Sequence, residues 1–229
     1  MKLVLLRHGE SQWNFENRFT GWTDVTLTKN GEDEAKKAGI LLKNNNIEID
    51  LAYISYLKRA IKTHKICQKQ LNKSKIESIY DWRLNERHYG ALQGLNKTQT
   101  AQKYGEEQVL IWRRSYDTAP PSLDCNDKRH PKNDILYKDI DKDKLPVSES
   151  LKDTLERVKP LLDNDIIPQI KNGKNILIVA HGNSLRAIVK ILKKITNKDI
   201  INLNIPTGIP YIFEMDKNIS LKKDYFLSD

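Results

Sequence analysis

The residues with the clearest capacity for chemistry are an arginine and a histidine at the end of a short apolar run. Arg7, His8 and Gly9 directly follow the apolar residues Leu3–Leu6. A neutral imidazole is a nucleophile, and a guanidinium can bind a phosphate through two parallel hydrogen bonds. Glycine lets a neighbouring backbone approach closely. This combination favours chemistry in which a phosphoryl group is taken up by a histidine.

A second histidine–glycine pair occupies the same kind of position. His181, Gly182 and Asn183 follow the apolar run 176–180. Two such pairs at strand ends predict one composite site. We expect His8 to be the nucleophile, with a neutral ring, because nearby arginines disfavour the imidazolium. His181 is then expected to donate a hydrogen bond to the phosphoryl oxygens while charge builds during transfer.

The chain resembles the histidine phosphatase superfamily in the segment RHGESQWN, residues 7–14. Within that superfamily it is similar to the cofactor-dependent phosphoglycerate mutases, from about residue 2 to about residue 215. The further motifs that carry this similarity are Thr20-Gly21-Trp22, Arg59-Ala60, Glu86–Gly90, Leu92–Lys97, Trp112–Arg114, Glu149–Leu151 and Asn204–Gly208. The resemblance implies interconversion of 2-phosphoglycerate and 3-phosphoglycerate in glycolysis and gluconeogenesis, through a phosphohistidine, with 2,3-bisphosphoglycerate as primer and intermediate.

The resemblance also implies a set of catalytic residues: Arg7, His8, Arg59, Glu86 and His181. Glu86 is expected to act as general acid and base, because a substrate hydroxyl that attacks phosphohistidine must lose a proton. Two arginines and two histidines can supply the charge stabilisation that phosphoryl transfer needs. No Asp-rich cluster or His-x-His spacing is present, so we expect no metal.

A second basic cluster is expected at the far end of the substrate. Its members are Arg87, Tyr89, Lys97, Arg113 and Arg114. A substrate with a phosphate at one end and a carboxylate at the other needs two anion sites, whereas a simple phosphatase needs one. The family further implies substrate contacts from Ser11, Asn14, Thr20, Gly21, Gly182 and Asn183. His64, His88 and His130 are assigned no catalytic role.

The chain has 229 residues and a formal net charge of +9. This length is typical of a single α/β domain. Lysines spread along the chain indicate a solvated surface. The apolar run at the N-terminus is too short for a signal peptide, and no segment approaches the ~20 apolar residues of a membrane span. We therefore expect a soluble cytoplasmic protein in which Cys67 and Cys125 are reduced. The resemblance suggests a homodimer or homotetramer.

Apolar runs and helical periodicity predict a three-layer α/β fold, with a mainly parallel sheet covered by helices on both faces. Strands are expected at 3–6, 51–55, 76–79, 176–180 and 211–214. Helices are expected after a Thr28 cap, over 57–71 and over 184–195. Residues 95–150 are polar and contain several prolines, and we expect them to form a cap within a single domain spanning 1–229.

Two alternative functions remain open from the sequence. A bisphosphoglycerate synthase or phosphatase would use the same residues, and water access to phosphorylated His8 would decide between them. A non-enzymatic polyanion or nucleic-acid binder is disfavoured, because the arginines lie in compact motifs and form no stripe. Only eight residues follow Leu221, whereas many relatives carry a longer tail that closes the site. We expect the 95–150 cap to suffice for closure.

Overall fold

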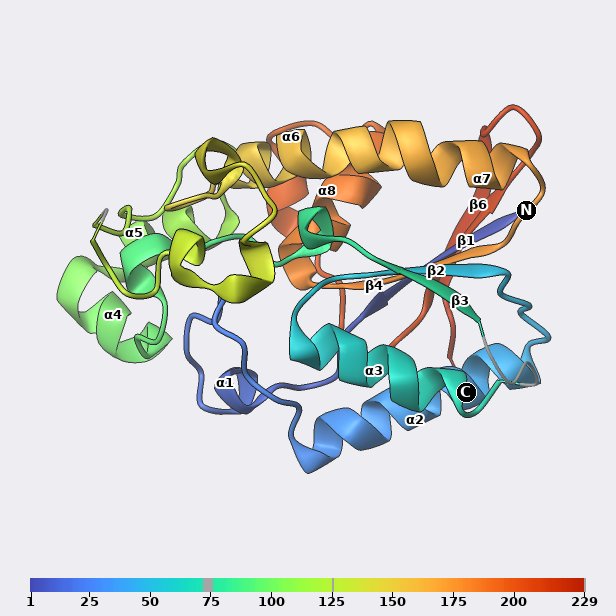
Figure 1. Ribbon diagram of the computed structural model, residues 1–229, viewed down its shortest axis with the longest axis horizontal. Coiled ribbons are helices and arrows are strands. Elements are labelled where there is room, and N and C mark those ends of the chain that lie inside the picture. Colours follow the sequence, from blue (N-terminus) through green and yellow to red (C-terminus); the bar gives the residue numbers. More distant parts are fainter. Residues whose placement is uncertain (72–75, 125, 229) are drawn as a thin grey trace.

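The computed structural model describes residues 1–71, 76–124 and 126–228, so the expectation for Cys125 lies outside the described residues. Its centre is one six-stranded sheet in the order β3-β2-β4-β1-β5-β6 (Figure 1). The strands are β1 (Lys2–Arg7), β2 (Leu51–Ile54), β3 (Glu77–Tyr80), β4 (Ile176–Ala180), β5 (Tyr211–Met215) and β6 (Leu221–Phe226). All five predicted strands are therefore present, and the third begins one residue later than expected.

The first four strands of the chain run parallel, and β5 and β6 are antiparallel to their neighbours. The interior strands β1, β2 and β4 are continuous apolar runs because helices bury both faces of the sheet. The last strand, β6, was not predicted. Its sequence, LKKDYF, is largely polar because it lies at the edge of the sheet.

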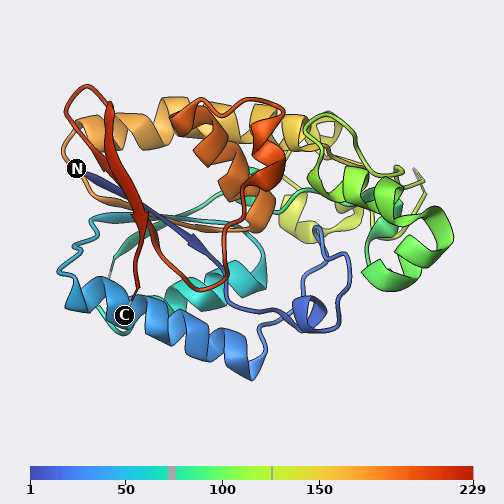
Figure 2. The ribbon, with the colours of Figure 1, turned by 180° about the vertical axis from the view of Figure 1, so that it is seen from behind.

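Helices cover both faces of the sheet, as Figures 1 and 2 show. The α-helices are α1 (Gln12–Phe15), α2 (Lys29–Asn44), α3 (Lys58–Gln68), α4 (Lys97–Tyr104), α5 (Glu106–Arg114), α6 (Leu151–Leu161), α7 (Ile167–Lys171) and α8 (Gly182–Lys193). Helices α2 and α3 lie on one face, and α6, α7 and α8 lie on the other. The π-helical turn Leu162–Ile166 joins α6 to α7.

Successive side chains of β1 point to opposite faces of the sheet, so they pack in two different hydrophobic clusters. Leu3 and Leu5 pack in the cluster that contains α6 and α8 residues, whereas Val4 and Leu6 pack in the cluster that contains α2 and α3 residues. All four side chains are fully buried. This burial on both sides fixes the register of β1, since a slip by one residue would exchange its two faces.

The three helices that the sequence predicts are all present. The Thr28 hydroxyl accepts a hydrogen bond from the backbone N–H of Gly31, so Thr28 caps α2 as predicted. Ala35, Ala38 and Leu42 of that helix are fully buried. The predicted helix over 57–71 is α3, and the predicted helix over 184–195 is α8, which begins two residues earlier.

Residues 95–150 extend beyond the carboxyl ends of the parallel strands, at the left of Figure 1. This segment contains α4 and α5, and a longer irregular stretch follows them. Short 3₁₀ helices lie at Trp82–Leu84, Gly90–Leu92, Pro131–Asn133, Ile135–Tyr137, Lys142–Lys144 and Asp199–Asn202. The polar composition of 95–150 is consistent with its position at the surface, where backbone groups without regular partners can bind water.

Candidate active site

The two histidine–glycine pairs meet at one edge of the sheet because β1 and β4 are parallel neighbours. Arg7 lies beside Ala180 in the register, and the His8 backbone N–H donates to the Ala180 carbonyl at 3.1 Å. The rings of His8 and His181 have centroids 4.8 Å apart and pack edge to face. Both side chains are buried. The two histidines that the sequence places at separate strand ends are therefore in direct ring contact.

Gly9 is required by a close approach of two backbone segments. A Cβ atom at Gly9 would lie 2.1 Å from the carbonyl oxygen of Gly31, at the start of α2. The Gly9 N–H donates to the Thr63 hydroxyl of α3 at 3.1 Å. The turn after β1 is thus packed against two helices, which holds His8 in place.

The His8 ring is held in a form suited to nucleophilic attack. Its Nδ1 lies 2.7 Å from the Gly9 carbonyl oxygen, which can only accept, so the proton resides on Nδ1. The other nitrogen, Nε2, keeps its lone pair. Burial lowers the pKa of His8 well below its usual value, and the charges of Arg59 and Arg7 lower it further. His8 is therefore neutral at physiological pH.

His181 makes a different set of contacts. Its Nε2 lies 2.8 Å from the Ser55 hydroxyl, at the carboxyl end of β2. Its side chain faces the backbone N–H of Ser184 at the start of α8, but Nδ1 is buried and forms no hydrogen bond of normal geometry within the described part of the chain. Burial lowers the pKa of His181 well below its usual value, with Arg59 as the second cause and His8 as the third.

The two arginines of the predicted catalytic set are anchored by backbone carbonyls. Arg7 Nη1 donates to Ile205 at 2.8 Å, and Arg7 Nε is buried with no partner among the described residues. Arg59 Nη1 and Nη2 donate to the carbonyls of Thr23 and Gly21 at 2.9 and 2.8 Å. Burial lowers the pKa of Arg59 to about 10, so it stays charged at neutral pH.

Glu86 lies in the loop that follows the 3₁₀ helix Trp82–Leu84, beside the start of α8. Its Oε1 accepts from the backbone N–H groups of Arg87 and Asn183, at 2.8 and 3.0 Å. Its Oε2 lies 3.7 Å from the position that a Cβ on Gly182 would occupy. Glu86 is 9% exposed. One carboxylate oxygen is thus fixed by backbone donors beside the His181 turn.

A buried ion pair that sequence reasoning missed supports this loop. Arg157 of α6 pairs with Glu149 at 2.7 Å, and both side chains are almost fully buried. Arg157 also donates to the carbonyls of Arg83 and Asn85. Glu149 accepts from the backbone N–H of His88 at 2.8 Å. Glu149 begins one of the family motifs, but nothing in its sequence context identifies Arg157 as its partner.

A cavity of about 120 Å³ lies between the strand ends and the 95–150 segment. The predicted residues that line it are Arg7, Asn14, Thr20, Gly21, Glu86, Tyr89, Lys97, Arg113, Arg114, Gly182 and Asn183. It is also lined by residues that were not predicted, namely Arg18, Arg186, Asn204 and Ile205. Among the described residues that line it, six are cationic and one is acidic. This charge balance favours an anionic ligand.

The remaining predicted residues, His8, Ser11, Arg59, Arg87 and His181, are buried and do not line this cavity. Ser11 caps α1, with its hydroxyl donating to Asn14 Oδ1 at 2.8 Å. Its hydroxyl is thus committed to the local helix cap.

Arg87 is a fully buried cation with free donors. Its Nη2 donates to the Arg113 carbonyl at 2.7 Å and to the Tyr89 hydroxyl at 3.0 Å. Its Nε and Nη1 are buried and make no hydrogen bond to any described residue. Buried charged donors without a partner are costly, so such an arrangement fits a site built for an anion.

Arg186 of α8 is the most informative residue that the sequence analysis missed. Its Nη1 donates to Asn183 Oδ1 at 2.8 Å, and its Nη2 donates to the Ile200 carbonyl at 2.8 Å. Burial lowers the pKa of Arg186 to about 10. It lies four residues after Gly182, one helical turn along α8, and that spacing was the available signal.

A sequence profile of the histidine phosphatase superfamily (branch 1) matches residues 3–130 and 124–220. This chain belongs to the histidine phosphatase superfamily. A 2,3-bisphosphoglycerate-dependent phosphoglycerate mutase 2 from Bacteroides thetaiotaomicron is 56% identical over 228 residues, which cover 100% of this chain and 92% of that protein. The superfamily expected from the RHGESQWN segment is therefore confirmed.

Solved structures share the fold of this superfamily member. A mycobacterial glucosyl-3-phosphoglycerate phosphatase in complex with VO3 superposes with a TM-score of 0.74 at 22% identity, covering 100% of this chain and 98% of that chain. The alpha-ribazole phosphatase from Shigella flexneri gives 0.72 at 21% identity, covering 100% and 96%. At these identities the likeness shows the fold alone, and it confirms the predicted α/β class.

Within residues 1–71, 76–124 and 126–228, no group of three or more His, Cys, Asp or Glu side chains is arranged to hold a metal ion. None of the helices in the same ranges is both long enough and apolar enough to cross a membrane.

Proposed function

We propose that this protein interconverts 2-phosphoglycerate and 3-phosphoglycerate through a phosphohistidine at position 8. The observation that carries the proposal is one cationic cavity that is lined both by Arg7, the residue before His8, and by the basic side chains Lys97, Arg113 and Arg114 of the 95–150 segment. The Bacteroides relative is a 2,3-bisphosphoglycerate-dependent phosphoglycerate mutase, and its 56% identity over the whole of this chain supports the same activity here. 2,3-Bisphosphoglycerate supplies the phosphoryl group that charges His8.

The reactive end of the site comprises His8, His181, Arg7 and Arg59. His8 Nε2 attacks phosphorus, while Nδ1–H remains bound to the Gly9 carbonyl and fixes the ring. Arg7 donates through its free Nε to the transferring group and stabilises its charge. Arg59 is buried near His8, and burial together with the charges of Arg59 and Arg7 lowers the pKa of His8 and keeps its ring neutral.

Glu86 is the proposed general acid and base. The Oε1 atom is held by two backbone N–H groups, which leaves Oε2 to exchange a proton with the substrate oxygen. When a monophosphoglycerate hydroxyl attacks the phosphohistidine, the proton moves to Glu86. In the reverse step the proton returns to the oxygen that leaves.

The cap end of the site holds the second anionic group. Arg113, Arg114 and Lys97 line that end, and burial lowers the pKa of Lys97 and of Arg114. Arg87 is buried next to them and donates to the Arg113 carbonyl. A bound carboxylate or phosphate would stabilise these charges. We propose accordingly that residues 95–150 form a cap within one domain spanning 1–229. Contacts from Asn14, Thr20, Gly21, Tyr89, Gly182 and Asn183 complete the proposed site, and Ser11 holds Asn14 in place through its hydroxyl.

The proposed setting of this reaction is the cytoplasm, in glycolysis and gluconeogenesis, and the proposed assembly is a homo-oligomer. A coupled assay for 2-phosphoglycerate formation tests the function. We expect turnover that depends on 2,3-bisphosphoglycerate, persists in excess chelator and exceeds the hydrolysis of 2,3-bisphosphoglycerate. Comparable transfer and hydrolysis rates would identify a bisphosphoglycerate phosphatase instead. Loss of turnover in chelator, restored by manganese or magnesium, would contradict metal independence.

A further inference from the structure

Ser55 connects His181 to a second buried polar residue. Its side chain is fully buried at the carboxyl end of β2. Its Oγ lies 2.8 Å from His181 Nε2, 2.8 Å from Asn85 Oδ1 and 3.2 Å from the backbone N–H of Leu57. A serine hydroxyl has one hydrogen, so it can donate to only one of these neighbours.

The orientation of the Asn85 amide decides which neighbour receives that hydrogen. Asn85 Oδ1 accepts from the backbone N–H of Tyr56 at 3.1 Å, and Asn85 Nδ2 donates to the Tyr137 hydroxyl at 2.9 Å. The atom of Asn85 that faces Ser55 is therefore the oxygen, which can only accept. At 2.8 Å the Ser55 hydrogen must lie between the two oxygens. Ser55 then has only lone pairs to offer to His181.

This arrangement determines the tautomer of His181. Because Ser55 accepts, His181 Nε2 carries the hydrogen. A neutral imidazole has one N–H, so Nδ1 of His181 carries a lone pair. That Nδ1 is buried without a hydrogen-bond partner in the described chain. In this state Nδ1 cannot donate to a phosphoryl oxygen.

We propose that Ser55, oriented by Asn85, is a positioning residue that holds the free His181 in the Nε2–H tautomer, so that phosphoryl binding is coupled to uptake of one proton at Nδ1. The proposal rests on the proposed function, in which the phosphoryl group lies between His8 and His181. The proton comes from solvent, and no bond to phosphorus changes. The resulting imidazolium donates from Nε2 to Ser55 and from Nδ1 to a phosphoryl oxygen.

The charges around His181 explain why the proton arrives together with the anion. Burial, Arg59 from α3, His8 and Arg7 from the end of β1, and Arg157 from α6 all oppose a positive charge on the ring. Glu86 is the carboxylate near the same turn, and its Oε1 is engaged by two backbone N–H groups. A phosphoryl dianion at the site offsets the arginine charges and makes the imidazolium favourable.

The tautomer is measured directly by long-range ¹H–¹⁵N correlation spectra of the ¹⁵N-histidine-labelled full chain without substrate. The His181 signals are assigned by their loss in His181→Gln. In the wild type we expect a neutral His181 protonated at Nε2. Protonation at Nδ1 in the wild type would overturn the proposal, whatever the variants do.

Two variants move the hydrogen in different ways. Ser55→Ala removes the acceptor, so we expect the Nδ1–H form to become populated. Asn85→Ala keeps the hydroxyl but frees its hydrogen to point at Nε2, so we expect the Nδ1–H form to dominate. Ser78→Ala is the control, because the Ser78 hydroxyl donates to the Ile76 carbonyl on the edge of the sheet. An unchanged tautomer in both site variants would contradict the proposal.

Calorimetry of inorganic phosphate binding, in two buffers of different ionisation enthalpy, counts the protons taken up. We expect the wild type to take up about one more proton per phosphate than Ser55→Ala, because the ionisation of phosphate itself is common to both. Equal counts would refute the coupling. The tautomer is read without substrate, so absence of mutase activity in the wild type would refute the proposed function without changing the tautomer result. Protonation at Nδ1 in an active wild type would refute this inference alone.

Discussion

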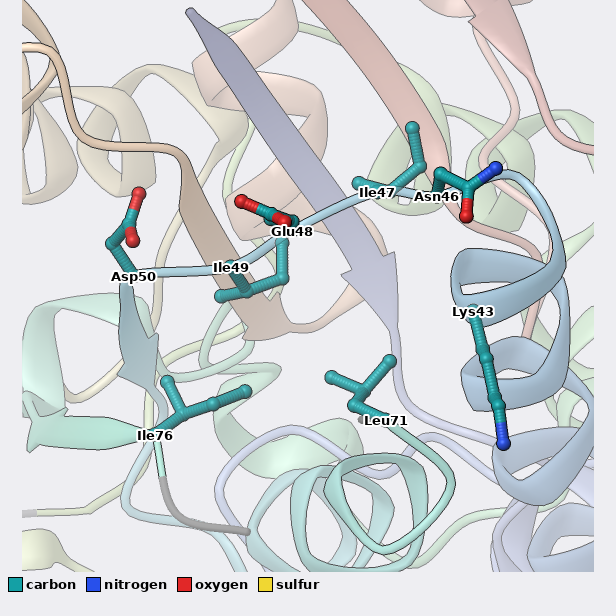
Figure 3. Close-up of a pocket in the computed structure, with 8 residues that line it drawn as sticks. All are labelled: Lys43, Asn46, Ile47, Glu48, Ile49, Asp50, Leu71 and Ile76. Atoms are coloured by element: carbon teal, nitrogen blue, oxygen red, sulfur yellow. The ribbon is translucent and has the colours of Figure 1, made fainter. Parts of the chain in front are cut away.

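Two cavities lie at opposite ends of the sheet, and they differ in what they bury. The larger, of about 370 Å³, lies at the amino ends of β2 and β3 and is shown in Figure 3. Its buried lining is apolar, with Ile47, Ile49 and Ile76 each under 7% exposed. The smaller, of about 120 Å³, lies at the carboxyl ends and is lined by charged residues.

The difference between the two cavities shows that the candidate active site is distinguished by buried charged side chains and not by the larger volume. At the amino end, Lys43 and Glu48 are exposed, so water solvates their charges. At the carboxyl end, Arg87 and Arg186 are buried among other cations, and each retains at least one nitrogen without a hydrogen bond inside the described residues. Burying charge in this way is costly unless an anion binds there.

Among substitutions that keep the His8 nucleophile, the largest expected effect comes from Glu86, the proposed acid–base residue. Glu86→Gln keeps the shape and the acceptor for the backbone N–H groups but cannot carry the substrate proton. We expect mutase turnover to fall by about 10²–10⁴, the usual range for general acid–base catalysis. Stopped-flow or coupled assays measure the change. Near-normal turnover would mean that another group carries the proton.

The buried cation at the cap end should have the next largest effect. Arg87→Met removes donors that we expect to bind the second anionic group, at a cost of about 1.5–3 kcal/mol for a hydrogen bond to a charged group. We expect kcat/KM to fall about 10- to 100-fold, since 1.4 kcal/mol is a factor of ten. Arg83→Met is the control, because Arg83 pairs with Asp81 away from the cavity. A similar loss in both variants would argue against a specific anion site.

Histidines outside the reactive pair should affect stability and not turnover. Burial lowers the pKa of His64 to about 4, from 6.5, so the neutral ring is the folded form. Below pH 6.5 the unfolded chain binds a proton that the folded chain does not. The free energy of unfolding should therefore fall as the pH falls from 6.5 to 4, by up to about 1.4 kcal/mol per unit from this residue.

The variant His64→Met removes this proton linkage. Urea unfolding at several pH values should give a shallower pH dependence for the variant than for the wild type, with unchanged turnover at pH 7.5. An identical slope in both proteins would show that His64 is not buried as a neutral ring.

The smallest effect is expected at the amino end. Ile49→Val removes one buried methylene from the wall of the larger cavity, at a cost of about 0.5–1.5 kcal/mol of stability. Mutase kcat/KM should stay the same, because no proposed substrate contact lies there. Thermal unfolding and a coupled assay on one preparation measure both quantities. A loss of activity greater than the loss of folded protein would assign a functional role to this cavity.

Much of the fold was predictable because the interior strands have a distinct composition. Continuous apolar runs predicted β1, β2 and β4. Strands that are buried on both faces are typical of parallel sheets, and β1 and β4 do pair in parallel. The edge strand β6 was not predicted because its side chains are partly or fully exposed, so its sequence is polar and contains no continuous apolar run. Helix α6 was also not predicted, although Ser150 and Asp153 form a capping box at its start.

Residues of the candidate site could be predicted where a motif carries them, and not where common residues outside a motif hold those side chains in place. His8 and His181 were identified because two strand ends carried the same pair. Ser55 and Asn85 were missed because a single serine and a single asparagine have no pattern in sequence. Their importance arises from contacts between β2 and the loop before Glu86, 30 residues apart in the chain.

Incubation with 2,3-bisphosphoglycerate carrying labelled phosphate tests the central claim most directly. The wild type should acquire an acid-labile, base-stable phosphoryl group, and mass spectrometry should place it on His8. His8→Ala should acquire no label and show no mutase turnover. Label on another residue, or label that survives in His8→Ala, would contradict the account.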